Sequence, residues 1–137
     1  MFLHLLDRAQ RRELCRAAMH LIAADGVVDL REEDVFAQVR SELGFFDPDD
    51  IPAPAPDLDA LLEGLEVFET TDAKNILVLE LLVLVLADGE LDPRELERLG
   101  AICRRLDVSR DAFARLENLA RRILDLRADG LDLIAGA

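Results

Sequence analysis

The sequence predicts an all-α fold, a compact bundle of about six to seven helices, and three observations support this prediction. Apolar residues recur three and four positions apart over most of the chain. One run, Ile76–Ala87, is apolar on nearly every side and indicates a buried central helix. An acidic stretch, ADGVVDLRE at 24–32, returns as ADGELDPRE at 87–95. We therefore expect one domain over residues 1–137, built from two pseudo-symmetric helical hairpins around the central helix.

The first hairpin is marked by residues that begin and end helices. Asp7 with Gln10 three positions later predicts a capped helix start, and Gly26 predicts its end. Asp29 begins a second helix, which Gly44 ends. The residues expected to face the core share helical spacing: Leu14, Ala17, Ala18, Leu21, Ile22, Val35, Phe36, Val39 and Leu43.

A proline-rich acidic connector, residues 45–56, separates the two hairpins. Its prolines exclude a helix and favour a stiff, extended segment. Neither side of it is long enough to bury a comfortable core of its own, so we expect a connector within one domain.

The second half repeats the pattern of capped helices. Asp57, Thr70 or Thr71, Asp92 and Ser109 are the expected helix starts. The expected inward residues are Leu58, Leu61, Leu62, Leu65, Phe68, Leu96, Leu99, Ile102, Leu106, Phe113, Leu116, Leu119, Ala120, Ile123 and Leu124. The central run is shorter than the about 20 residues that cross a bilayer, and it contains Glu80, so we expect no membrane insertion.

The composition restricts the classes of partner. A net charge of −13 repels nucleic acid and anionic lipid and attracts cations or basic proteins. Without tyrosine or tryptophan, nucleic-acid binding is not expected. Cys15 and Cys103 have no metal-ligand spacing and are expected to be core thiols of a reducing compartment. No signal peptide is recognised at the N-terminus.

The two acidic stretches align at an offset of 63 residues, together with the helices that flank them. ADGVVDLREED and ADGELDPRELE resemble the TerB-like family, named after tellurite-resistance proteins, over about residues 8–124. The resemblance implies a non-enzymatic, cytoplasmic module of stress-response or envelope-associated systems. It also implies a divalent cation at the loops, bound by the matching residues Asp25, Asp29, Glu32, Asp88, Asp92 and Glu95.

The residues themselves allow two interpretations of these loops. Capping explains the glycine, the second aspartate and the glutamate of each copy, with Pro93 at a first helical position. Asp25 and Asp88 instead stand near a helix C-terminus, where the macrodipole opposes an anion. Either backbone N–H groups or a bound Ca²⁺ or Mg²⁺ would compensate that charge, with Glu33 and Glu90 as further possible ligands. A third copy of the opening, ADGLD at 128–132, suggests that the pattern ends helices in this chain.

No complete catalytic constellation is present. The EF-hand spacing and the Glu-x-x-His pattern of bundle di-metal enzymes are both absent from the sequence. We expect His20 to be a structural histidine and Glu80 to lie on an exposed strip or to pair with Arg11, Arg12 or Arg16. The sequence thus predicts a protein-interaction domain, either responsive to a divalent cation or purely structural with acidic loops that meet a basic partner.

Overall fold

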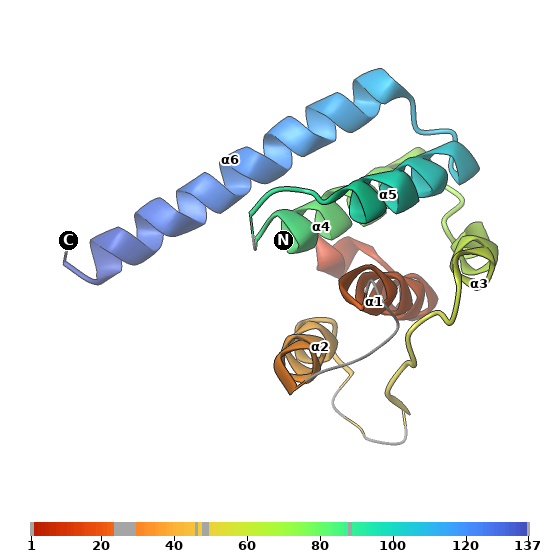
Figure 1. Ribbon diagram of the computed structural model, residues 1–137, viewed down its shortest axis with the longest axis horizontal. Helices are drawn as coiled ribbons and strands as arrows, with labels where there is room; N and C mark the ends of the chain where they lie inside the picture. The colour runs from red at the N-terminus through yellow and green to blue at the C-terminus, as the bar shows by residue number, and fades with distance from the viewer. Residues whose placement is uncertain (1, 24–29, 46, 48–49, 88, 137) are drawn as a thin grey trace.

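The computed structural model describes residues 2–23, 30–45, 47, 50–87 and 89–136, and for residues 30–35 only the backbone. The described residues form helices and no strands, which confirms the predicted all-α class (Figure 1). The elements are η1 (Leu3–Leu5), α1 (Arg8–Ile22), α2 (Leu30–Glu42), α3 (Leu58–Gly64), η3 (Leu65–Val67), α4 (Thr71–Leu86), α5 (Pro93–Arg105) and α6 (Arg110–Ile134).

The helices begin where polar caps were expected. Asp7 accepts a hydrogen bond from the backbone N–H of Gln10 at 2.8 Å, and the N–H of Asp7 donates to Gln10 Oε1 at 3.0 Å. Asp57, Thr70 and Ser109 each accept the N–H three residues on. These side chains satisfy backbone donors that have no partner inside the helix, so short local sequences determine the boundaries.

Helices α2 and α5 end in similar turns that pass through a residue with positive φ. At the end of α2, Gly44 has a φ of +87°, and the N–H of Phe45 donates to the carbonyl of Arg40 at 2.8 Å. At the end of α5 the same turn is made by Asp107, with a φ of +57°. An aspartate tolerates this conformation less well than glycine does, so the second turn is the more strained.

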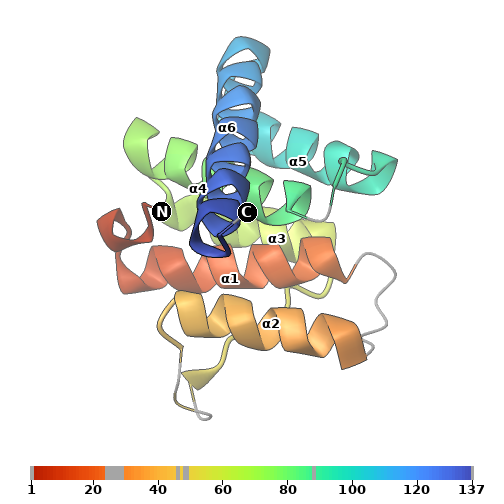
Figure 2. The same cartoon turned by 90° about the vertical axis from the view of Figure 1, so that its left-hand side faces the viewer.

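Helix α4 is the centre of the bundle, as its largely apolar run Ile76–Ala87 predicted. It packs against α1, α5 and α6, and α6 crosses it over the longest stretch (Figure 1). Its buried side chains are Ala73, Leu77, Val78, Leu79, Leu81, Leu82, Val83, Val85 and Leu86. Helices α1 and α2 lie side by side as the first hairpin (Figure 2). One continuous apolar core joins residues of all six helices.

The connector is docked on α1 instead of crossing solvent. The N–H of Ala55 donates to the carbonyl of Arg16 at 3.3 Å, and its carbonyl accepts from Nδ1 of His20 at 2.7 Å. Pro52 and Ala55 are both buried. The expected non-helical segment is confirmed for Ile51–Ala55, and α1 satisfies both backbone polar groups of Ala55.

The first turn of α1 holds the other end of the connector. Arg8 forms an ion pair with Asp50, and its guanidinium lies 5.0 Å from the centre of the Phe45 ring. The proline-rich stretch is therefore anchored at both ends to a single helix.

Helix α6 departs most from expectation. The ADGLD sequence lies inside it, so this third copy of the opening does not end a helix. A single helical glycine such as Gly130 costs about 1 kcal/mol relative to alanine, which good helix formers on both sides offset. The helix runs about 37 Å, and its C-terminal end projects beyond the bundle (Figure 1). Leu96 and Leu119, both expected to be buried, are instead exposed.

Candidate functional site

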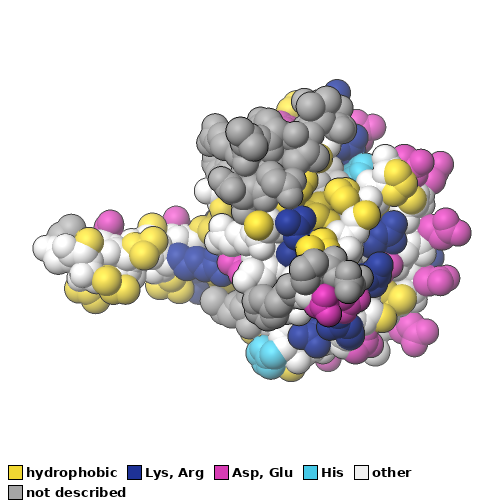
Figure 3. Space-filling model, turned by 90° about the horizontal axis from the view of Figure 1, so that it is seen from below, with side chains coloured by type: hydrophobic (Ala, Val, Ile, Leu, Met, Phe, Trp, Pro, Cys, Tyr) yellow, Lys and Arg dark blue, Asp and Glu magenta, His cyan; other side chains and the backbone are white. Residues whose placement is uncertain are grey.

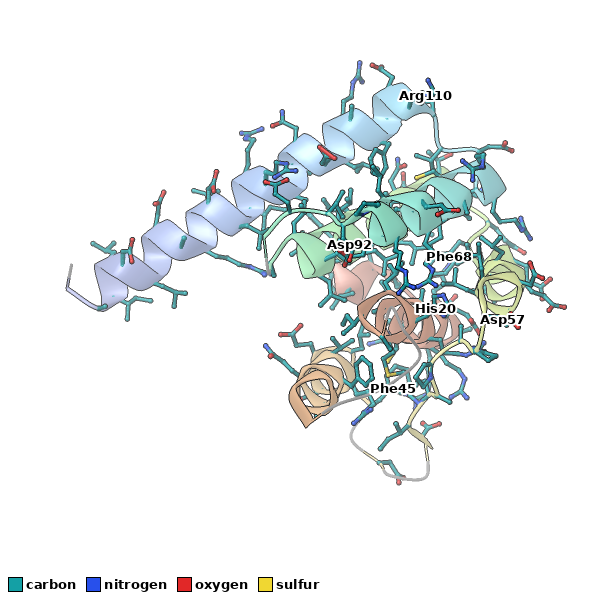
Figure 4. All side chains as sticks on the ribbon, in the orientation of Figure 1. His20, Phe45, Asp57, Phe68, Asp92 and Arg110 are labelled. Atoms are coloured by element: carbon teal, nitrogen blue, oxygen red, sulfur yellow. The ribbon has the colours of Figure 1, made fainter. Side chains whose placement is uncertain are left out.

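The second acidic loop ends in a reciprocal cap at the start of α5, where Figure 4 labels Asp92. Asp92 Oδ1 accepts from the N–H of Glu95 at 2.7 Å, and the N–H of Asp92 donates to Glu95 Oε1 at 3.1 Å. Pro93 stands at the first helical position, where its missing N–H costs nothing. Both carboxylates thus have a structural role, which confirms the capping interpretation for these two residues.

Glu90, in the same loop, is held by α6. Its two carboxylate oxygens accept from the guanidinium of Arg121 at 3.2 and 3.0 Å, and Glu117 lies 3.8 Å from the same guanidinium. The hydrogen bond and the positive charge of Arg121 lower the pKa of Glu90 below its ordinary value. This forked contact joins Glu90 to the last helix at the protein surface.

The structure does not describe the side chains of the other four predicted metal ligands. Asp25, Asp29 and Asp88 lie outside the described residues, and so does the side chain of Glu32, whose backbone belongs to α2. Within the described part of the chain, no three His, Cys, Asp or Glu side chains are grouped to hold a metal ion. The divalent-cation site therefore stays a prediction that rests on the sequence.

The glycine of the second loop adopts a conformation that favours glycine. Gly89 has a φ of +130°, and its N–H donates to the carbonyl of Leu86, the last residue of α4. A residue with a Cβ would be strained there. This explains the glycine of ADG at residue 89 without any ligand.

Sequence reasoning missed a cavity at the meeting point of η1, α1, α2, α4 and α6. Its volume is about 220 Å³, less than the roughly 300 Å³ at which pockets for drug-sized ligands begin. Such a space fits one or two side chains. The apolar lining consists of Leu3, Leu14, Ala18, Val39, Leu43, Val83, Leu84 and Ala87, and the polar lining of Gln38, Glu42, Glu80 and Arg127.

Glu80 was expected on an exposed strip or beside Arg11, Arg12 or Arg16. It is half-buried in the lining of this cavity, and its Oε1 accepts from the backbone N–H of Phe2 at 2.8 Å. The N-terminal segment folds back onto α4 and supplies this donor. No sequence spacing indicates such a contact, because its two residues are 78 positions apart in the chain.

His20 is a buried structural residue, as expected. Because Ala55 offers a carbonyl oxygen, Nδ1 of His20 carries the proton and donates it (Figure 4 labels His20 on α1). Nε2 is buried and meets no hydrogen-bond partner among the described residues. The imidazole of His20 therefore binds the connector to α1.

Both cysteines are free and buried, which confirms their expected place in the core. Burial raises the pKa of Cys15 and of Cys103 to about 11. A thiol with such a pKa is a poor nucleophile near neutral pH.

Comparisons with known proteins place the chain in no family. No family model, curated protein or solved structure matches it. Of the helices that the structure describes, none is both long and apolar enough to cross a membrane. The TerB-like resemblance accordingly stays an inference from the two acidic loops.

Proposed function

We propose that this chain is a non-enzymatic interaction domain of the TerB-like type, which binds a basic, amphipathic segment of a partner protein at the cavity between η1, α1, α2, α4 and α6. The cavity carries the proposal. Its walls are mostly apolar, and its volume suits an anchoring side chain such as leucine or phenylalanine.

Charge supports a basic partner. Two glutamates, Glu42 and Glu80, line the cavity against one arginine, Arg127, and the whole chain has a net charge of −13. A cationic segment is therefore attracted to this surface at long range, and its apolar residue is desolvated only at the cavity. The carboxylates confer specificity and speed of encounter, and the apolar walls confer most of the affinity.

A peptide-display library of random sequences is the direct test. Selection on the full chain should enrich peptides with a large apolar residue flanked by lysine or arginine. In a labelled sample, the selected peptide should shift the NMR signals of Leu3, Val39 and Leu84, which line the cavity. Enrichment of acidic or purely polar peptides would contradict the proposal.

A matched pair of charge reversals separates the cavity from the general acidity of the chain. Glu42 lines the cavity, whereas Glu97 lies on α5, and both side chains are exposed. Glu42→Lys should weaken binding of the selected peptide about tenfold, and Glu97→Lys should weaken it far less. Equal losses in the two variants would show that bulk charge alone binds the peptide.

A further inference from the structure

The last turns of α6 leave the bundle and carry apolar side chains into solvent. From Asp125 to Gly136, every residue except Gly130 is exposed. Figure 3 shows hydrophobic side chains along this projecting end. A contiguous apolar stripe on an exposed helix is typical of a surface that another helix covers.

Three leucines form this stripe at seven-residue intervals. Leu119, Leu126 and Leu133 are 36%, 69% and 79% exposed. Seven residues make just under two helical turns, so the three side chains follow one line along α6. Repetition at every seventh position is the pattern of a seam between two paired helices.

The charges of α6 are divided between its two ends. From Arg110 to Leu124 there are four arginines and two carboxylates, whereas from Asp125 to Ile134 there are three aspartates and one arginine. A second α6 in the same direction would place like charges together. A second α6 in the opposite direction places the basic half of each helix beside the acidic half of the other.

We infer that α6 pairs with the α6 of a second copy of this chain in antiparallel orientation, with the leucine stripe as the seam of a symmetric dimer. The two-fold axis passes near Leu126, which meets the partner's Leu126. Leu119 of each copy then packs against the partner's Leu133. A symmetric pair of this kind covers each exposed leucine of the stripe with a leucine of the partner's stripe.

Two charged residues beside the seam select this register. Arg122 is four positions before Leu126 and Asp129 three positions after it, so both lie along the same edge of the stripe. In the antiparallel register, Arg122 stands within one residue of the level of the partner's Asp129, and the symmetry repeats the pair. Such exposed pairs contribute orientation more than affinity.

Analytical ultracentrifugation of the full chain from about 1 µM to about 1 mM tests the association. The sedimentation coefficient should rise with concentration from monomer to dimer. Leu126→Asp should raise the dissociation constant about a hundredfold, because the substitution occurs twice at the axis and each loss is worth about tenfold. Leu126 is exposed in one copy, so the melting temperature of the dilute monomer should stay unchanged. A chain that remains monomeric at every concentration would overturn the inference and assign the stripe to a different partner.

Charge exchange and cross-linking test the orientation. Arg122→Asp and Asp129→Arg should each weaken the dimer, and the double variant should restore it only if the helices are antiparallel. Mixed Leu119→Cys and Leu133→Cys chains should form a disulfide-linked heterodimer upon oxidation, and the buried native cysteines do not compete. Cross-linking of each variant with itself in place of the mixed pair would show a parallel dimer and overturn the register. Neither measurement depends on the cavity.

Discussion

Replacement of Asp92 separates a structural cap from a cation ligand. Asp92→Ala removes the acceptor that holds the N–H of Glu95 at 2.7 Å, and loss of an N-cap costs about 1 kcal/mol, within a range of roughly 0.5–2. The unfolding entropy of a 137-residue chain is about 0.29 kcal/mol per kelvin. We therefore expect the melting temperature to fall by about 3–4 °C. Thermal unfolding followed by circular dichroism at 222 nm measures it.

A second variant, Asp92→Asn, tests whether the cap needs its negative charge. Asparagine caps a helix about as well as aspartate, so only the charge interaction with the helix dipole, about 0.3–1 kcal/mol, is lost. Asp7 provides the matched control, because it makes the same reciprocal cap with Gln10 but lies outside the acidic loops. At Asp7, the asparagine variant should lower the melting temperature less than the alanine variant does. If the two variants of Asp92 instead lower it equally, the loop needs the negative charge of Asp92. The capping account would then be refuted.

Titration with divalent cations tests the other interpretation of the loops, a bound metal ion. Calorimetric titration with Ca²⁺, Mg²⁺, Mn²⁺ and Zn²⁺ tests the ion that the two loops predict, and Asp25→Asn/Asp88→Asn is the variant that should abolish it. A bound ion at a hundredfold excess over its dissociation constant would add about 2.7 kcal/mol to the free energy of unfolding. Absence of both heat and a melting shift in the unaltered chain would exclude the ion.

Three further predictions follow from other contacts. Because their pKa values are about 11, Cys15 and Cys103 should resist Ellman's reagent at pH 8 in the folded chain and react completely in guanidinium. Fast labelling of either cysteine in the folded chain would contradict their burial. The lowered pKa of Glu90 stabilises the fold above the ordinary pKa of a glutamate, and this contribution is lost as the pH falls through the folded value. Arg121→Ala should therefore raise the pKa of Glu90 in a carbon-13 NMR titration, and an unchanged titration would contradict the ion pair. Asp107→Gly should raise the free energy of unfolding in urea by about 0.5–1 kcal/mol, because glycine accepts a positive φ without strain. A lower free energy of unfolding would show that the aspartate has another role.

The helix boundaries were predictable because their causes are local. Asp7, Asp57, Asp92 and Ser109 cap helices through bonds that reach only three residues along the chain. The same locality explains the failure at Gly130. After Gly89, Asp92 is followed by Pro93 and by Glu95, which complete the cap of a new helix. After Gly130, Asp132 is followed by neither a proline nor a glutamate, so α6 continues.

Tertiary features were beyond the reach of periodicity. Leu119 has the spacing of an inward residue, but α6 turns the neighbouring Ala120 and Ile123 into the core and leaves Leu119 off the contacting face. Glu80 binds the N–H of Phe2, and His20 binds the carbonyl of Ala55, across 78 and 35 residues. Such pairs depend on how the helices are placed relative to one another, which a single sequence does not encode in any spacing. For the same reason, the cavity had no signal in the sequence.

The docked connector has a consequence for dissecting the chain. Composition alone would recommend residues 45–56 as the place to cut, because proline-rich segments commonly link separable units. A cut there would strip Pro52 and Ala55 from α1 and leave the carbonyl acceptor of His20 without a fixed position. Each fragment alone would expose apolar residues of the shared core. We therefore expect the two fragments to fold only when they are mixed and bind each other, and not as independent halves. Held to α1 through Ala55 and the buried Pro52, the connector is thus a structural part of the fold and not a hinge.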